Sequence, residues 1–370
     1  MRANAPAVRD GGLVIDVDGP DGSSALTFRL PPGIEAGCRA DASLAATLFP
    51  AMRNGQDLTI EGPVSPRLLA GVDAIQAVFC TWDRALRLRH PWYRRVDVRS
   101  TQPPPSSSAR TDERGTAAFF TGGVDSFHTA IVHRRALDAL VYVHGFDIPL
   151  DDRLLRAEVS TRLGAAAADL GLPLLEVEAD LQAFGDRSGV GWPDYHGAAL
   201  ATIAHLLASR FSRVLIPATH TYAHLEGLGS HPLLDPLWST DEVEIEHVGA
   251  DATRIDKVRA IASEPAARAH LRVCWENRGG AYNCGRCEKC IRTGVAIRIA
   301  GAEGAFPGVP PPSLVDVARA RPTGRGSAWT DLHDELVRLG TNPRLQRAVE
   351  VACARHQAGR LVPLRRRRST

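Results

Sequence analysis

Hydrophobic and polar positions alternate along residues 12–30, GLVIDVDGPDGSSALTFRL, on both sides of the turn-forming stretch GPDGSS. Such alternation around a turn predicts a β-hairpin. Residues 41–55 and 65–86 instead have helical spacing. The second of these helices carries an apolar stripe of Leu69, Val72, Ile75, Val78, Phe79 and Trp82. We therefore predict that residues 1–100 form a small α+β domain, in which we identify no catalytic constellation.

A Pro- and Ser-rich stretch, residues 101–115, is typical of a linker. After it, apolar runs of strand length alternate with stretches of helical period. The expected strands are 117–120, 139–146, 173–180 and 213–219, and the expected helices include 153–171 and 195–211. This order predicts an α/β fold over residues 116–300, a parallel sheet with helices on both faces. A helical C-terminal extension, residues 301–358, and a basic tail, residues 359–370, are expected to follow.

The composition adds few constraints to this picture. The 370 residues are 44% hydrophobic and 23% charged, with a formal net charge of +2, so we expect no nucleic-acid partner. Neither a signal peptide nor a membrane-spanning run is evident, and we expect a cytoplasmic protein whose cysteines are thiols or metal ligands. Cys38 and Cys80 are interpreted as buried small hydrophobes.

The basic residues are strongly biased towards arginine, with 42 Arg and only two Lys. We attribute the excess of Arg to a GC-rich coding sequence. Lys257 is interpreted as functional because Lys and Arg are not chemically interchangeable, whereas Lys289 is attributed to chance.

Residues 117–135, AAFFTGGVDSFHTAIVHRR, read as a strand, a glycine-rich bend and a helix. Such a bend is suited to an anion, because glycines allow close approach and the first N–H groups of a helix point at the ligand. A plain Gly-Gly turn with Ser126 as a helix cap is the alternative. The bend matches neither a Walker A loop nor a dinucleotide fingerprint.

The stretch Thr121-Gly122-Gly123-Val124-Asp125-Ser126 resembles the PP-loop, S-G-G-x-D-S, of the N-type ATP pyrophosphatases, which have an adenine nucleotide alpha hydrolase-like fold. The resemblance implies that this loop holds the pyrophosphate end of ATP, with backbone N–H groups from the two glycines and hydroxyls from the flanking Thr and Ser. Asp125 would orient Mg²⁺ or the loop itself. His144 and Asp147, in VHGFD after the second strand, would contact adenine; a strand-end His and a turn Asp are the alternative.

Four cysteines, Cys274, Cys284, Cys287 and Cys290, lie within 17 residues in CWENRGGAYNCGRCEKC. Two C-x2-C bends and four thiolates favour a Zn²⁺ site, and Gly285 relaxes the first bend. An iron–sulfur cluster and redox thiols are left open.

Together, the glycine-rich bend and the cysteines resemble the 7-cyano-7-deazaguanine synthase family over about residues 116–295. That family activates a carboxylate with ATP, adds ammonia and dehydrates the amide to a nitrile; its four cysteines bind a structural zinc. HGFDIP stands where the family has a tyrosine-glycine-glutamine segment, and GSHPLLDPLWS replaces its substrate loop. The ATP chemistry should therefore carry over better than the substrate does.

The segment 219–240 is long for a connection and rich in polar side chains. Its candidates for substrate binding are His220, Tyr222, His224, Glu226, His231, Asp235 and Trp238. We choose His220 and Asp235 as candidate bases. Arg254 and Lys257 lie three residues apart on one helix face and would neutralise the phosphates as pyrophosphate leaves. The alternative is a solvated face.

The sequence thus predicts an adenylating ligase that acts on a small-molecule or peptide carboxylate with ATP, Mg²⁺ and Zn²⁺. A tRNA-modifying PP-loop enzyme and a non-catalytic ATP- or partner-binding module are the alternatives, and a homodimer is left open.

Overall fold

The computed structural model describes residues 1–20, 22–35, 40–87, 90–103, 113–323 and 326–361. Cys38, most of the expected linker and nearly all of the basic tail lie outside these residues. The chain forms two compact units. The sheet unit comprises residues 1–121, 129–218 and 227–250, and the helical unit comprises residues 122–128, 219–226 and 251–370.

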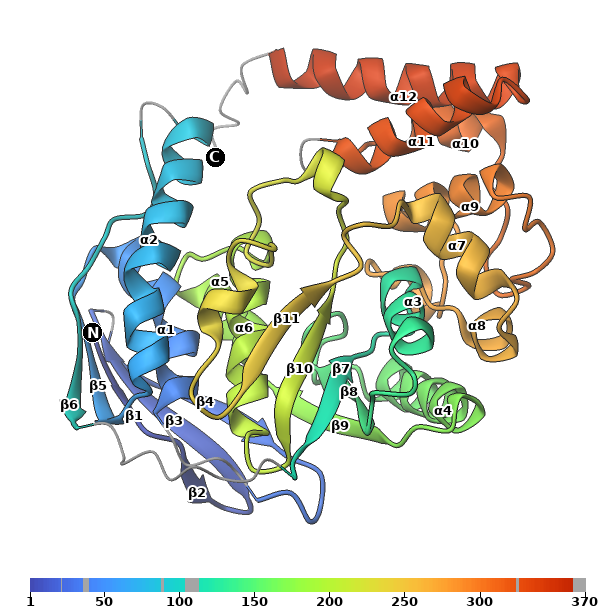
Figure 1. The fold of residues 1–370 in the computed structure, drawn as a ribbon. Coiled ribbons are helices and arrows are strands. Elements are labelled where there is room, and N and C mark those ends of the chain that lie inside the picture. Colours follow the sequence, from blue (N-terminus) through green and yellow to red (C-terminus); the bar gives the residue numbers. More distant parts are fainter. Residues whose placement is uncertain (21, 36–39, 88–89, 104–112, 324–325, 362–370) are drawn as a thin grey trace. The chain divides into compact units, whose positions relative to one another are not determined.

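The sheet unit contains five parallel strands in the order β11-β10-β7-β8-β9. They are β7 (Gly115–Phe119), β8 (Ala139–His144), β9 (Leu174–Ala179), β10 (Phe211–Pro217) and β11 (Glu244–Val248) (Figure 1). The strand order reverses between β7 and β10, and sheets of this kind bind ligands beyond the carboxyl ends of the strands at that point. The loops that follow β7 and β10 contribute residues 122–128 and 219–226 to the helical unit.

The N-terminal strands continue the same sheet, because β4 pairs antiparallel with β9 and places Phe28 opposite Ala179. Beyond β4 the order is β3-β1-β5-β6, and β2 pairs with β3. These strands are β1 (Arg2–Asn4), β2 (Ala7–Arg9), β3 (Gly12–Gly19), β4 (Gly22–Arg29), β5 (Leu58–Pro63) and β6 (Val98–Gln102). The structure therefore differs from the expected arrangement of a separate domain over residues 1–100, and the sheet is mixed rather than parallel.

Helices cover both faces of this sheet. Val141 and Val143 of β8 join the core that also contains α1 (Asp41–Asn54) and α6 (Trp192–Leu206). Alternate residues of a strand point to opposite faces. His144 accordingly faces α4 (Arg153–Leu170), where the Oγ atom of Ser160 lies 3.4 Å from its Nε2 atom. The remaining helices of this unit are α2 (Pro66–Leu86) and α5 (Leu181–Arg187), with the 3-10 turn η2 (Asp235–Trp238). The expected α/β class is confirmed.

The helical unit comprises the chain after residue 250 and residues of the two loops that follow β7 and β10. Its helices are α7 (Arg254–Ala262), α8 (Pro265–His270), α9 (Glu288–Ile299), α10 (Leu314–Arg319), α11 (Ser327–Leu339) and α12 (Pro343–Leu361), with the 3-10 turns η1 (Tyr222–His224) and η3 (Arg278–Gly280). The first residues of α3 (Val124–Val132) also belong to it. Helix α11 packs against α7, α9 and α12, so the expected C-terminal extension shares one unit with the cysteines. Within the described ranges, no helix is both long and apolar enough to cross a bilayer.

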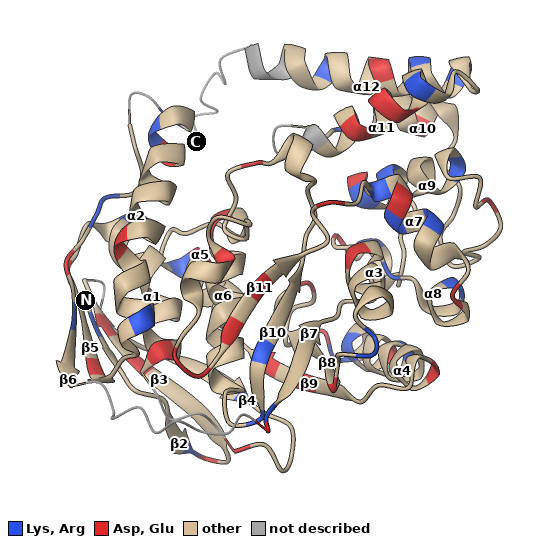
Figure 2. Cartoon of the chain, viewed as in Figure 1, with Lys and Arg blue, Asp and Glu red and all other residues tan. Residues whose placement is uncertain are grey.

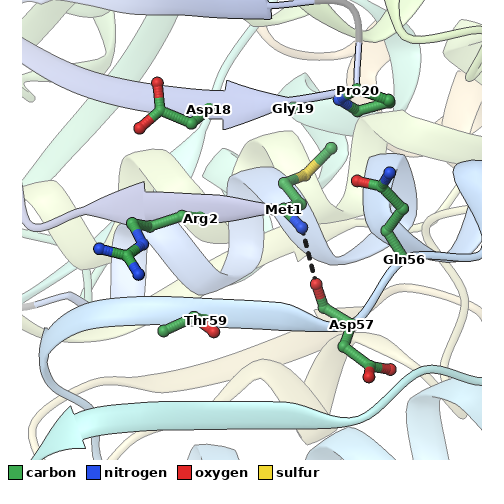
Figure 3. Close-up of a pocket in the computed structure, with 8 residues that line it drawn as sticks. All are labelled: Met1, Arg2, Asp18, Gly19, Pro20, Gln56, Asp57 and Thr59. Carbon is green, nitrogen blue, oxygen red and sulfur yellow. Dashed lines mark hydrogen bonds between the residues drawn. The ribbon is translucent and has the colours of Figure 1, made fainter.

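A polar pocket of the sheet unit lies beside β1, β3 and β5 (Figure 3). Its lining residues are Met1, Arg2, Asp18, Gly19, Pro20, Gln56, Asp57 and Thr59. The Met1 amino group donates a hydrogen bond of 2.8 Å to the Asp57 carbonyl oxygen across it. The lining contains neither histidine nor cysteine, and the charges on it are of both signs. The glycine-rich bend and the four clustered cysteines instead lie in the helical unit.

Candidate anion site and metal centre

The glycine-rich bend leads into α3 at Val124. Gly122 has a φ of +70°, which L side chains rarely adopt, and its carbonyl oxygen accepts a 2.8 Å hydrogen bond from the N–H of Arg272. The Ser126 hydroxyl donates to the Gly123 carbonyl oxygen at 3.1 Å. The bend is therefore fixed by its own backbone and by the segment that precedes the first cysteine. Thr121, which precedes it directly, is the last residue of its segment of the sheet unit.

Asp125 holds two cations from α7. Its Oδ1 atom lies 3.2 Å from the Lys257 Nζ atom, and its Oδ2 atom lies 3.1 Å from the Arg254 Nη2 atom. The side chains of Arg254 and Lys257 are only 4% and 2% exposed. Burial alone would raise the pKa of Asp125, but Arg254, Lys257 and Lys289 together lower it to about 2. The carboxylate is therefore ionised at all ordinary pH values.

The sequence of α7 explains why these two cations point inward. Thr253 and Asp256 form a capping box at the N-terminus of the helix, which fixes the start of the helix and the direction of its faces. Ile255, Val258 and Ile261 are buried, and Arg254 and Lys257 are buried with them. The alternative interpretation of a solvated face is therefore wrong.

Positive charge is in excess around Asp125. Helices α7 and α9 both contain Lys and Arg residues (Figure 2). Lys289 and Arg292 of α9 act electrostatically on Asp125 and Arg254 respectively. The Arg254 Nε atom and the Arg292 Nη1 atom are buried with no hydrogen-bond acceptor among the described residues. Buried donors of this kind are rare in folded proteins and are costly unless a ligand or water accepts from them. We call Arg254, Lys257, Lys289 and Arg292 the cation cluster.

His220 lies in the loop that follows β10. Burial lowers its pKa, and the nearby Glu226 carboxylate raises it less than burial lowers it, while Arg292 and Arg254 lower it further. The imidazole is therefore mostly neutral near pH 7, the state that can accept a proton. The same loop is attached to α11, because His224 Nδ1 forms a short contact with an Asp331 carboxylate oxygen.

The four cysteines come together in the helical unit, with all four Sγ atoms within 4.8 Å of one another. Cys274 and Cys287 have their sulfurs 3.8 Å apart, and Cys284 and Cys290 have theirs 4.0 Å apart. Tetrahedral ligation with Zn–S bonds of about 2.3 Å needs S···S separations of about 3.8 Å. The four cysteines are therefore positioned to hold a metal ion.

The backbone around the cysteines also fits a metal site. The N–H groups of Asn277, Cys287 and Cys290 each point at a cysteine sulfur, at 3.3 to 3.4 Å. Such donors stabilise thiolates. Gly285 has a φ of +67°, and a Cβ there would lie 3.2 Å from Pro310, which explains the glycine in the first C-x2-C bend.

Two further predicted residues, His144 and Asp235, lie in the sheet unit with partners of their own. His144 contacts Glu176 at 2.6 Å and accepts from Arg156 at 3.2 Å. Asp235 is fully buried and accepts hydrogen bonds from the Ser230 hydroxyl at 2.7 Å and the His231 N–H at 3.2 Å; His247 lies 2.7 Å away. Each of these residues therefore has its own polar partners within the sheet unit. Asp147 follows β8 in the same unit and is half-buried.

Sequence reasoning missed Lys289, Arg292 and Arg272. Lys289 was attributed to chance, yet its charge acts on Asp125. The signal that could have found it is spacing, because Lys289 and Arg292 repeat on α9 the three-residue interval of Arg254 and Lys257 on α7.

Comparison of the chain with protein-family models, with curated proteins and with solved structures found no match.

Proposed function

We propose that the chain is an ATP-dependent adenylating ligase of the PP-loop class, related in chemistry to 7-cyano-7-deazaguanine synthases. The observation that carries the proposal is the cation cluster beside the glycine-rich bend, in which Arg254, Lys257 and Arg292 are buried and Lys289 is half-buried. Two of its guanidinium donors, Arg254 Nε and Arg292 Nη1, have no acceptor among the described residues, and its charge exceeds that of Asp125 and Glu288. A bound polyphosphate supplies both the missing acceptors and the missing negative charge.

The positions of the groups support the following proposed roles. The N–H groups at the start of α3 receive the β- and γ-phosphates, as anions bind at helix N-termini. Lys257 and Arg254, held by Asp125, take up the charge that develops as pyrophosphate leaves the α-phosphorus. His220, neutral near pH 7, accepts a proton from the nitrogen nucleophile that later displaces AMP. Mg²⁺ is expected to enter with the nucleotide.

The metal bound by the four cysteines is proposed to be a single Zn²⁺ with a structural role. Four sulfur ligands complete a tetrahedral site and leave no coordination position for a substrate. Cys287 is the N-cap of α9 and Cys290 lies in its first turn, so the site fixes the start of the helix that carries Lys289 and Arg292.

Calorimetry with Mg²⁺ and an ATP analogue that cannot be cleaved between the α- and β-phosphates tests the proposal. Wild type should bind, and Lys257→Ala should bind at least about tenfold more weakly, since a charge-assisted hydrogen bond to a buried anion contributes about 1.5–3 kcal/mol. Arg259→Ala is the matched control, because Arg259 lies on the same helix with its side chain 40% exposed. Absence of binding to wild type, or equal loss in both variants, would contradict the proposal.

Product analysis separates the alternatives. An adenylating enzyme releases AMP and pyrophosphate once its carboxylate and nitrogen substrates are supplied. Nucleotide binding with no turnover across a broad set of carboxylates, peptides and transfer RNAs would favour the non-catalytic module. Turnover that requires transfer RNA would favour the modification enzyme.

A further inference from the structure

Three side chains of the helical unit form a buried chain of contacts outside the bend. The Trp329 indole Nε1–H donates a 2.6 Å hydrogen bond to the Glu288 Oε1 atom, and the Arg292 Nε atom lies 2.9 Å from the same oxygen. Trp329 is 1% exposed, Glu288 8% and Arg292 7%. Glu288 is thus held between an indole of α11 and a guanidinium one turn further along α9.

The contact at Glu288 leaves Arg292 with unused donors. Its ion pair with Glu288 uses one edge of the guanidinium group, and Nη1 is buried with no acceptor among the described residues. Helix α9, which carries Arg292, packs against α7, which carries Arg254. The charge of Arg292 also acts on Arg254 and on His220. Two buried guanidinium groups of like charge repel each other unless an anion lies between them.

We propose that Arg292 is a further anion-binding residue of the site and that Trp329 is its positioning residue, acting through Glu288. The inference rests on the proposed function, since it gives a residue of the C-terminal extension a part in nucleotide binding. Without the indole N–H, Glu288 loses a hydrogen bond that fixes its carboxylate. The guanidinium group of Arg292 then loses its fixed orientation and with it part of its contribution to anion affinity.

The placement of α11 supports this role. Besides Trp329, it contributes Asp331, which contacts His224 of the loop after β10, and Glu335, which lies 3.2 Å from Arg259 of α7. One helix therefore contacts each of the three elements that carry His220, Arg254 and Arg292. Leu332 and Leu336 anchor it in the unit's interior.

Calorimetric titration with inorganic pyrophosphate tests the inference in the full-length, metal-loaded protein. Arg292→Gln should lower the affinity about tenfold or more, and Trp329→Phe should lower it several-fold. In the Arg292→Gln background, Trp329→Phe should have no further effect, because a residue that acts through another has no effect once that other is absent. Glu288→Gln, which still accepts the indole N–H, should weaken binding as Arg292→Gln does.

Two control variants test whether a general loss of stability, rather than the loss of a specific contact, weakens pyrophosphate binding. Arg298→Gln removes a guanidinium from the same helix where the side chain is 39% exposed, and it should leave the affinity unchanged. Leu336→Ala destabilises α11 without touching Glu288, and at a temperature where it stays folded its affinity should match wild type.

The outcomes separate the two proposals. Additive effects of Arg292→Gln and Trp329→Phe, or wild-type affinity in Arg292→Gln, would overturn the inference and leave the proposed function standing. Absence of pyrophosphate binding to wild type would overturn both.

Discussion

The Nζ atom of Lys257 lies 3.2 Å from the Oδ1 atom of Asp125, although 132 residues separate them in the chain. Asp125 belongs to the glycine-rich bend, and Lys257 belongs to helix α7. The sequence indicated Asp125 through the resemblance to the PP-loop, and Lys257 because lysine is rare in this chain. Their contact changes the role expected of Asp125. An aspartate in a loop at the end of a strand is expected to make few packing contacts. Asp125 instead neutralises two buried cations.

Replacement of Asp125 by Asn should therefore cost stability as well as activity. Two buried cations would be left without their carboxylate, and breaking a buried ion pair on one side costs about 3–5 kcal/mol. Urea denaturation followed by circular dichroism measures this loss. Asp256→Ala, in which an exposed carboxylate of the α7 capping box is removed, is expected to cost only about 1 kcal/mol. Equal losses in the two variants would show that Asp125 does not neutralise the cluster.

The same contact makes stability depend on pH in a defined window. The folded-state pKa of Asp125 is lowered to about 2, below the ordinary value of 3.8. A lowered pKa stabilises the folded state above the unfolded-state pKa, and this contribution is lost as pH falls from about 4 towards 2. It amounts to about 2 kcal/mol at neutral pH. The stability difference between wild type and Asp125→Asn should thus shrink between pH 5 and pH 2.5, and a constant difference would contradict this assignment.

The metal prediction is tested by elemental analysis. Protein purified without chelators should contain about one zinc per chain, and Cys287→Ser should lower both the zinc content and the melting temperature. Cys353→Ser is the matched control, because Cys353 is a half-buried cysteine that lies outside the four-cysteine cluster. Iron with visible absorbance, or a metal-free folded protein, would contradict the zinc assignment.

Cleavage in the expected linker, residues 101–115, tests whether the segments on both sides of it belong to one sheet unit. Limited proteolysis should cut there first, because the composition is that of an extended segment. The two fragments should nevertheless elute together under native conditions, since residues on both sides of the cut belong to the sheet unit. Tyr195 of the second fragment donates a 2.6 Å hydrogen bond to the Ala46 carbonyl oxygen of the first, within the shared core. Separation of the fragments without denaturant would show that the halves are independent.

Local structure was largely predictable because its causes are local. The hairpin at β3 and β4 follows from alternation around GPDGSS, and α1 ends where Gly55 adopts a φ of +62°. Helix α4 ends in the same way at Gly171. The four-cysteine cluster followed from spacing alone.

Strand pairing across the chain could not be predicted in this way. Nothing in the local pattern of β4 says that its partner is β9, because the choice depends on which sheet edge the completed fold leaves unpaired. The roles of Lys289 and Arg292 in the cation cluster were missed for a related reason. The packing of α7 and α11 against α9 cannot be inferred from the sequence of α9 alone.

The pairing of β4 with β9 also has a consequence for synthesis on the ribosome. The Thr27 N–H donates a hydrogen bond to the Asp180 carboxylate 153 residues later, so the two edges are translated far apart in time. At elongation rates of about 5–20 residues per second, the hairpin waits roughly 8 to 30 s before its partner strand emerges. During that interval its outer edge is open to pairing with other nascent chains. Slow translation or loss of a chaperone should therefore reduce the yield of this protein before any effect on the stability of its finished fold is measurable.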